Sequence, residues 1–288
     1  MDDRSGLLPQ QLRGVWQQVT EGRLTTEAAV TEQDRLIAQH RRCWAQALIE
    51  PGRATLEESL LGELGAYVGS QDLDALRAQC REAVQGLKAE WLSRVDRNDD
   101  DSVFRYYRET KGILHELIWW HTLTEDDSPL AYVNALDLAM RGDGRRYLDF
   151  GSGVGSGGLL FARAAFEVTL ADVSAPLLTF CRWRFSRRGL RARFLDTAVD
   201  RLPEAAFDVI TAMDVFEHLT DPVTVAEDLV RALAPGGLLV ARLHADDEPD
   251  RPQHIVTDFA AVFERLADMG CVKIWDDDWL WGHQAFQK

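Results

Sequence analysis

The fold of this chain is decided at Tyr147-Leu148-Asp149-Phe150-Gly151-Ser152-Gly153-Val154-Gly155. A short apolar segment there runs into a cluster of glycines, a helical pattern follows, and a second apolar segment ends on Asp172. This order predicts a strand, a tight turn, a helix and a second strand. Glycine lets the backbone approach a ligand closely, and a carboxylate after the second strand can accept hydrogen bonds from the two hydroxyls of a ribose. The stretch therefore predicts a site for a cofactor that contains a nucleoside.

The glycines alone leave two classes of cofactor open. Residues 153–158 also fit the dinucleotide pattern Gly-x-Gly-x-x-Gly, so an NAD(P)-dependent oxidoreductase is one reading of the site. Asp149 stands directly before the turn and argues against that reading. Its charge would repel a pyrophosphate, whereas it would attract a sulfonium or an amino group.

Two later segments extend the pattern. Residues 207–214 read Phe207-Asp208-Val209-Ile210-Thr211-Ala212-Met213-Asp214, which is typical of another strand that ends in an acid. Residues 233–240 predict a helix end, a turn at Pro235-Gly236-Gly237 and a further strand. With these motifs in this order, residues from about Leu130 to Lys288 resemble a class I S-adenosylmethionine-dependent methyltransferase. The resemblance implies an α/β fold with a Rossmann-like seven-stranded, mostly parallel sheet, helices on both faces and a last antiparallel strand near residues 280–286.

The resemblance also implies that the cofactor is S-adenosyl-L-methionine and that matching residues build its site. The loop glycines would approach the methionine part of the cofactor, and Asp149 would bind its amino group directly or through water. Asp172 would accept both ribose hydroxyls. Asp196 would face the adenine amino group unless it only caps a helix or turn. The expected cofactor-binding residues are Asp149, Gly151, Gly153, Gly155, Asp172, Asp196, Thr197 through its backbone amide, Met213, His218 and Tyr107.

A methyl acceptor that carries a hydroxyl needs a base, and three residues after the predicted strands are candidates. His244 follows the fifth strand, and His254 lies in the polar loop 245–257. Asp214 ends the fourth strand, although it is as well suited to cap the turn at residues 215–218. The histidines and acids of the polar loop match no closed metal site, so the sequence predicts no metal.

Residues 1–127 show no strand alternation and predict an all-α accessory domain before a methyltransferase domain at residues 128–288. Helices are expected over residues 10–20, 25–48, 56–68 and 73–95, and as one continuous helix over 103–123. We expect this region to serve as a lid, an acceptor pocket or a homodimer interface. The aromatic side chains around Tyr106 and Tyr107 would otherwise simply pack in a core.

Composition narrows the class of acceptor. The net charge of −15 disfavours nucleic acid, because phosphates would be repelled over most of the surface. No apolar run approaches the ~20 residues of a membrane helix, and no signal peptide is visible. The 4 cysteines are far apart, which favours a reduced, cytoplasmic protein. We therefore expect a small-molecule or short-peptide acceptor, as in natural product biosynthesis. A non-catalytic adenosylmethionine-binding scaffold is the remaining alternative.

Overall fold

A computed structural model describes residues 6–123, 128–244, 251–277 and 282–288. Its centre is a seven-stranded sheet in the order β3-β2-β1-β4-β5-β7-β6. Strand β7 runs antiparallel to β5 and β6, and the remaining pairs are parallel. The predicted fold class is thereby confirmed. The strands are β1 Arg146–Phe150, β2 Glu167–Asp172, β3 Arg193–Asp196, β4 Phe207–Ala212, β5 Leu233–Arg242, β6 Val272–Asp276 and β7 His283–Gln287.

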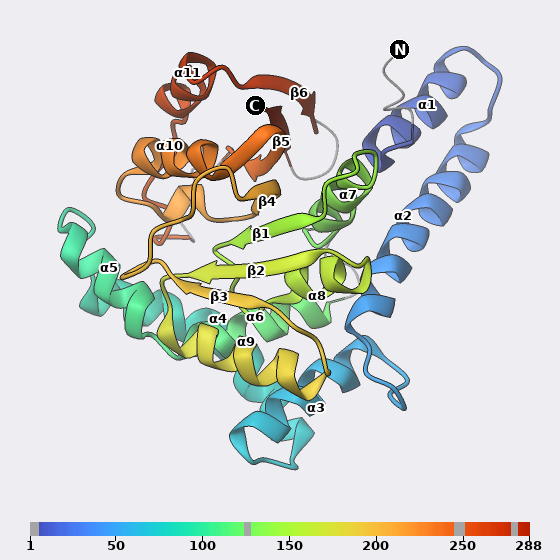
Figure 1. Ribbon diagram of the computed structural model, residues 1–288. Helices are drawn as coiled ribbons and strands as arrows, with labels where there is room; N and C mark the ends of the chain where they lie inside the picture. The colour runs from blue at the N-terminus through green and yellow to red at the C-terminus, as the bar shows by residue number, and fades with distance from the viewer. Residues whose placement is uncertain (1–5, 124–127, 245–250, 278–281) are drawn as a thin grey trace.

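Alternate residues of the central strands enter two different hydrophobic clusters. Tyr147 and Val209 belong to one cluster, and their neighbours Leu148 and Ile210 belong to the other. This alternation follows from the two-residue period of a strand and shows that both faces of the sheet are covered. Helices α8 Ser156–Arg163 and α9 Ala175–Arg187 cover the first face, and α10 Pro222–Ala232 and α11 Ala260–Asp268 cover the second (Figure 1).

The region before the sheet is helical, as predicted. Its helices are α1 Leu8–Thr20, α2 Thr26–Leu48, α3 Leu56–Val68, α4 Leu73–Arg94, α5 Asp100–Glu109, α6 Gly112–Thr122 and α7 Leu130–Ala139. Several begin where a side chain caps the helix: Thr25, Thr55 and Asp72 each accept a hydrogen bond from a backbone N–H of the first turn.

The expectation of one continuous helix over residues 103–123 is wrong. The chain leaves the helical conformation at Thr110, whose φ of −66° and ψ of 120° are extended, and it resumes as α6 at Gly112. A Cβ atom at Gly112 would lie 3.0 Å from Cδ2 of Leu87. The break therefore lets α6 pack closely on α4 while α5 turns away.

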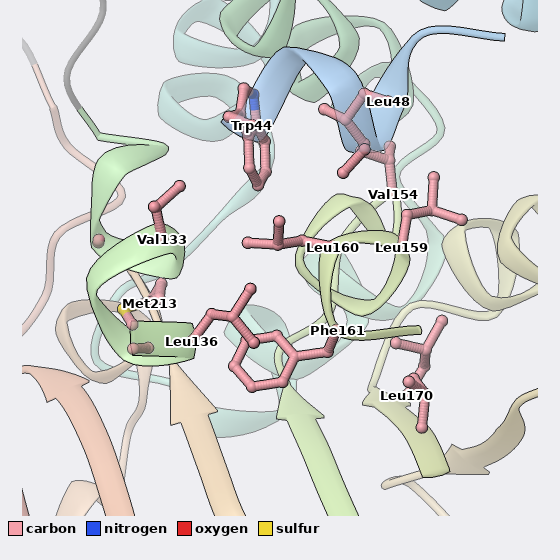
Figure 2. Packing of buried hydrophobic residues seen from close by; sticks show 14 of the residues in the cluster. Trp44, Leu48, Val133, Leu136, Val154, Leu159, Leu160, Phe161, Leu170 and Met213 are labelled. Atoms are coloured by element: carbon pink, nitrogen blue, oxygen red, sulfur yellow. The ribbon is translucent and has the colours of Figure 1, made fainter. Parts of the chain in front are cut away.

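The helices before residue 128 share a hydrophobic core with the sheet. Trp44 and Leu48 of α2 lie beside α8 residues such as Leu160, as Figure 2 shows. The ring of Tyr67, near the end of α3, stands edge-on to Phe180 of α9, with 5.0 Å between the centroids. The division of the chain at residues 127 and 128 stays a prediction, because this cluster runs across it.

Strand β5 differs from its prediction at Pro235-Gly236-Gly237. The structure has no separate turn there, and β5 begins already at Leu233. Leu233 pairs with Phe207 and Leu238 pairs with Val209, so the extra residues bulge out of the ladder. Gly236 has a φ of +75° within this bulge, a conformation that glycine adopts readily.

The parallel strands end at one edge of the sheet, where α5 lies beyond the arrowheads of β1 and β2 (Figure 1). In folds of this kind, ligands bind at the carboxyl ends of the strands. Helix α5 and the start of α6 therefore stand over the expected binding edge. No helix within the described residues is long and apolar enough to cross a membrane.

Candidate active site

The glycine loop between β1 and α8 is held in a conformation that requires glycine. Gly151, Gly153 and Gly155 have φ values of +68°, +53° and +74°. Space is also limited there, because a Cβ atom would lie 2.4 Å from Val215 Cγ2 at Gly151 and 2.8 Å from Leu117 Cδ1 at Gly153. The loop is therefore shaped for close approach, and α6 contributes Leu117 to its surroundings.

Asp172 at the end of β2 is tied to the glycine loop. Its Oδ2 accepts a hydrogen bond from the N–H of Gly153, and its Oδ1 accepts one from the N–H of Ser174, both at 2.8 Å. A carboxylate oxygen can accept two hydrogen bonds, so each oxygen can still accept from a ribose hydroxyl. Burial raises the pKa of Asp172 to about 6. The geometry suits the ribose role that the sequence analysis expects for this residue.

Asp196 ends β3 directly beside Asp172, since the two residues are register partners. Its Oδ1 accepts hydrogen bonds from Nη1 of Arg108 at 2.5 Å and from the N–H of Ala198 at 3.1 Å. Arg108 also donates to the carbonyl oxygen of Val173 at 2.8 Å. Helix α5 is therefore fixed to the adenine side of the expected site by an arginine that the sequence analysis missed.

The expected role of the Thr197 amide needs a correction. The sequence analysis places this N–H at the adenine, but in the structure it donates to the carbonyl oxygen of Asp172 at 3.1 Å. The cause is the register of β2 and β3, which pairs Asp172 with Asp196 and so brings the next amide onto the neighbouring strand.

Asp149 lies fully buried beneath the loop. Its Oδ2 accepts from the N–H of Gly158 at 3.0 Å, and its Oδ1 accepts from the hydroxyl of Thr211 at 3.1 Å. The hydroxyl of Tyr132 lies 3.5 Å from the same Oδ1. Burial raises the pKa of Asp149 to about 7. The carboxylate thus holds together α8, β4 and α7, and its contact with the cofactor amino group stays a prediction.

The end of β4 presents Met213 and Asp214. Met213 is buried in the cluster that contains Val133 and Leu136 of α7 (Figure 2). Asp214 has a φ of +53°, which is unusual for a residue with a side chain, and its carboxylate is 44% exposed. Its Oδ1 accepts a hydrogen bond from Nη1 of Arg242 at 2.9 Å. Strain of this kind is characteristic of functional sites.

His218, which was expected at the cofactor, and His254, which was expected as a base, lie together with Tyr107. Nδ1 of His218 is 2.9 Å from the hydroxyl of Tyr107 and 3.1 Å from the carbonyl oxygen of Gln253. The ring of His254 stands against His218, with 5.0 Å between the centroids. Burial, together with the neighbouring His218, lowers the pKa of His254 to about 4. As a base, His254 is therefore weaker than an ordinary imidazole.

His244 does not join this group. It is exposed after β5, and the nearest atoms of its ring and Cβ lie 3.7 Å from a Cβ built on Gly282. The acids at residues 246–250, which the sequence analysis noted beside it, lie outside the described residues. Its role as a base stays a prediction.

Sequence reasoning missed two further polar groups near the site. Nδ1 of His121 lies 2.9 Å from the hydroxyl of Ser156, at the start of α8. Glu116 on α6 is half-buried, and burial raises its pKa to about 7. A base with a pKa near the working pH is the most effective, so Glu116 joins the candidates. Only its place in the aromatic segment 104–121 could have drawn attention to it.

A surface cavity of about 470 Å³ borders the histidine pair. Two of its lining residues, Leu219 and Ile255, directly follow His218 and His254 in the sequence. The others are Arg97, Asn98, Asp100, Thr220 and Val256. No residue of the glycine loop lines this cavity, so we do not assign the cofactor to it.

The sheet order, the glycine loop and the paired acids at the carboxyl edge define an α/β protein that binds an adenosine-containing cofactor. Comparison with known proteins gives the family. Residues 148–241 match the family model of the methyltransferase domain. This chain therefore contains a class I S-adenosylmethionine-dependent methyltransferase domain, which confirms the resemblance seen in the sequence, and its cofactor is S-adenosylmethionine.

Curated relatives match over the same part of the chain. A demethylmenaquinone methyltransferase of Thermus thermophilus is 37% identical over 110 residues, covering 37% of this chain and 50% of that protein. A ubiquinone biosynthesis O-methyltransferase of Vibrio cholerae is 30% identical over 128 residues, covering 41% of this chain and 52% of that protein. The chain thus spans about half the length of these relatives. A solved S-adenosylmethionine-dependent methyltransferase from Aquifex aeolicus aligns at 20% identity with a TM-score of 0.44, covering 57% of this chain and 93% of that one.

Proposed function

We propose that this protein transfers a methyl group from S-adenosylmethionine to an oxygen, nitrogen or sulfur atom of a small molecule or short peptide. One observation carries the proposal: Asp172 and Asp196 are register partners at the carboxyl edge of the sheet, beside a glycine loop that Asp172 itself holds. This arrangement suits the ribose and adenine of the cofactor. Its sulfonium would then lie toward the end of β4, where Asp214 is exposed.

Methyl transfer requires little of the protein beyond the positioning of the cofactor and the acceptor. The acceptor atom attacks the methyl carbon in line with the carbon–sulfur bond, which breaks to release S-adenosylhomocysteine. Holding the two reactants in this geometry supplies most of the rate enhancement. A hydroxyl acceptor must also lose its proton, and Glu116, His244, His254 and Asp214 are the candidate bases.

An oxygen of a small aromatic molecule is the acceptor that we favour within this class. The support comes from the Vibrio cholerae relative, whose name describes an O-methyltransferase of ubiquinone biosynthesis; the name of the Thermus thermophilus relative gives demethylmenaquinone without the methylated atom. The charge of −15 supports an acceptor other than nucleic acid. Helices α5 and α6 lie over the expected binding edge, and this position supports an acceptor small enough to be enclosed there. We also propose a cytoplasmic role in tailoring specialised metabolites, and a homodimer through the helical region.

The test is methyl transfer to a panel of acceptors. Purified protein with methyl-labelled S-adenosylmethionine would be offered catechols, hydroxyquinones, amines, thiols and short peptides, and labelled products would be separated and identified. We expect labelled product from at least one phenolic acceptor, and much less of it from the Asp172→Ala variant at a cofactor concentration below saturation. Tight cofactor binding without product from any acceptor would favour the scaffold alternative instead.

A further inference from the structure

The strongest unexplained feature of the site is the meeting of Glu217, His218 and His254. Glu217 and His218 lie in the short helix η1 Phe216–His218 after β4, and His254 comes from the segment before α11. Each offers one potential ligand atom, and these atoms all lie within 4.8 Å of one another. Two imidazoles and a carboxylate that converge from distant parts of the chain form a donor set for a metal ion.

The carboxylate of Glu217 is poorly compensated by the protein. Its side chain is fully buried, and neither oxygen has a hydrogen-bond partner among the described residues. Nη1 of Arg242 lies 3.6 Å from Oε1 of Glu217, but this atom lies closer to Oδ1 of Asp214, at 2.9 Å. Burying a carboxylate without hydrogen bonds is strongly unfavourable. A bound cation would supply the missing interaction.

The histidines are oriented as metal ligands commonly are. Nδ1 of His218 lies 3.1 Å from the carbonyl oxygen of Gln253, which favours a proton on Nδ1 and leaves the lone pair of Nε2 available. The hydroxyl of Tyr107 contacts the same Nδ1 at 2.9 Å. Partners of this kind fix the ring and tautomer of ligating histidines. Nδ1 of His254 is buried and has no hydrogen bond to the described residues.

We propose that Glu217, His218 and His254 bind one divalent transition-metal ion of the Mn²⁺, Fe²⁺, Co²⁺ or Zn²⁺ class. Imidazole nitrogen favours these ions, whereas Mg²⁺ and Ca²⁺ prefer ligand sets made of oxygen. Three protein ligands leave coordination positions open for water or another ligand. The sequence predicts no metal because the histidines and acids of the loop after β5 match no closed metal site; among the described residues of that loop, His254 contributes to this cluster. Metal binding at these side chains does not require the proposed methyl transfer; in the metal-bound protein His254 would be a ligand, and Glu116, His244 and Asp214 would be the candidate bases.

Metal binding can be measured without any substrate. Untagged full-length protein, stripped with a chelator, would be titrated with Co²⁺ in the absorption spectrometer and with Zn²⁺ and Mn²⁺ in the calorimeter. We expect one ion per chain and visible Co²⁺ bands typical of nitrogen and oxygen ligands. Mg²⁺ at the same concentrations should not displace Co²⁺. Displacement by Mg²⁺ would overturn the proposed class of ion.

Variants assign the ion to these side chains. Glu217→Gln and His254→Ala should each weaken Zn²⁺ affinity by more than about tenfold and alter the Co²⁺ bands. Tyr107→Phe should have a smaller effect in the same direction, because it removes only a partner of His218. His115→Ala, a histidine of α6 outside the cluster, is the control and should bind as the wild type does.

Circular dichroism would show which variants are folded, and His254→Gln provides a second, less disruptive change. Folded Glu217→Gln and His254→Gln variants that bind Zn²⁺ as tightly as the wild type would overturn the proposal. Failure of the wild-type chain to bind any of these ions would do the same.

Discussion

Arg184 of α9 and Glu63 of α3 form an ion pair in which both side chains are fully buried, with Nε 3.0 Å from Oε2. Nη1 of Arg184 also donates to the carbonyl oxygen of Val154 at 2.8 Å and to the hydroxyl of Ser156 at 3.0 Å. Arg188 pairs with the same carboxylate at 2.6 Å. Burial alone would raise the pKa of Glu63, but the two arginines hold it below its ordinary value. Glu63 of the helical region thereby supports the glycine loop through Arg184.

Replacing Glu63 should destabilise the protein strongly. Glu63→Gln leaves two buried arginines without a counter-charge, and breaking a buried pair in this way costs about 3–5 kcal/mol. The free energy of unfolding in urea would measure the loss. The control is Glu50→Gln, which breaks the more exposed pair with Arg187 and should cost less than about 1 kcal/mol. Equal losses in the two variants would contradict the assigned importance of the buried pair.

The fragment 128–288 should not fold by itself. Without residues 1–127, apolar side chains of the fragment such as Leu160 and Phe180 would be exposed. In the whole chain, Trp44 and Tyr67 cover them. Large exposed apolar patches favour aggregation. We expect the full chain to show a cooperative thermal transition by circular dichroism and the fragment to show none. A fragment that melts cooperatively and binds S-adenosylhomocysteine would show that the helical region is a separable addition.

Cofactor affinity should depend on pH through Asp172. The pKa of this carboxyl is about 6, and the ribose hydroxyls bind better to its charged form. Affinity for S-adenosylhomocysteine should therefore be constant above pH 7 and should fall as the pH drops through 6, by up to about tenfold per unit. Calorimetry between pH 8 and pH 5 would measure it.

The control for this pH dependence is Asp149→Asn, since Asp149 titrates near pH 7. This variant should keep the loss of affinity below pH 6. A flat profile in the wild type, or a profile that disappears with Asp149, would contradict the assignment to Asp172.

Asp196 should select the adenine base. Its orientation is fixed by Arg108 and by the amide of Ala198, and its second oxygen can accept from the adenine amino group. S-inosylhomocysteine lacks that amino group, so the wild type should bind it about 10- to 100-fold more weakly than S-adenosylhomocysteine. Asp196→Ala should lose most of this difference, whereas Asp143→Ala, on an exposed turn, should retain it. An unchanged ratio in Asp196→Ala would rule out the adenine contact.

The order of the strands along the chain and the acids at their ends could be predicted, because each follows from a local sequence pattern. Glycines after a strand such as β1, and a single acid such as Asp172 after the next, are visible without knowledge of distant contacts. The break at Thr110 could not be predicted in this way. The apolar stripe continues through it, and the packing of Gly112 on Leu87 of another helix ends α5 there.

The polar partners of the site depend on contacts between distant residues. Arg108 is 88 positions from Asp196, and Glu63 is 121 positions from Arg184. Helical periodicity shows which face of a helix is buried, but it does not show which charge lies opposite. The Thr197 amide was misplaced for a related reason, because its partner is set by the register between β2 and β3.

The central claim is that the glycine loop and its acids bind S-adenosylmethionine rather than a dinucleotide. Calorimetric titration of the purified full-length chain with S-adenosylhomocysteine, and in parallel with NADH, tests it most directly. The account predicts micromolar binding of S-adenosylhomocysteine at one site per chain, a loss of about 1.5–3 kcal/mol in Asp172→Ala, and no binding of NADH. Binding of NADH alone would contradict the account and would identify the glycine loop as a dinucleotide-binding site.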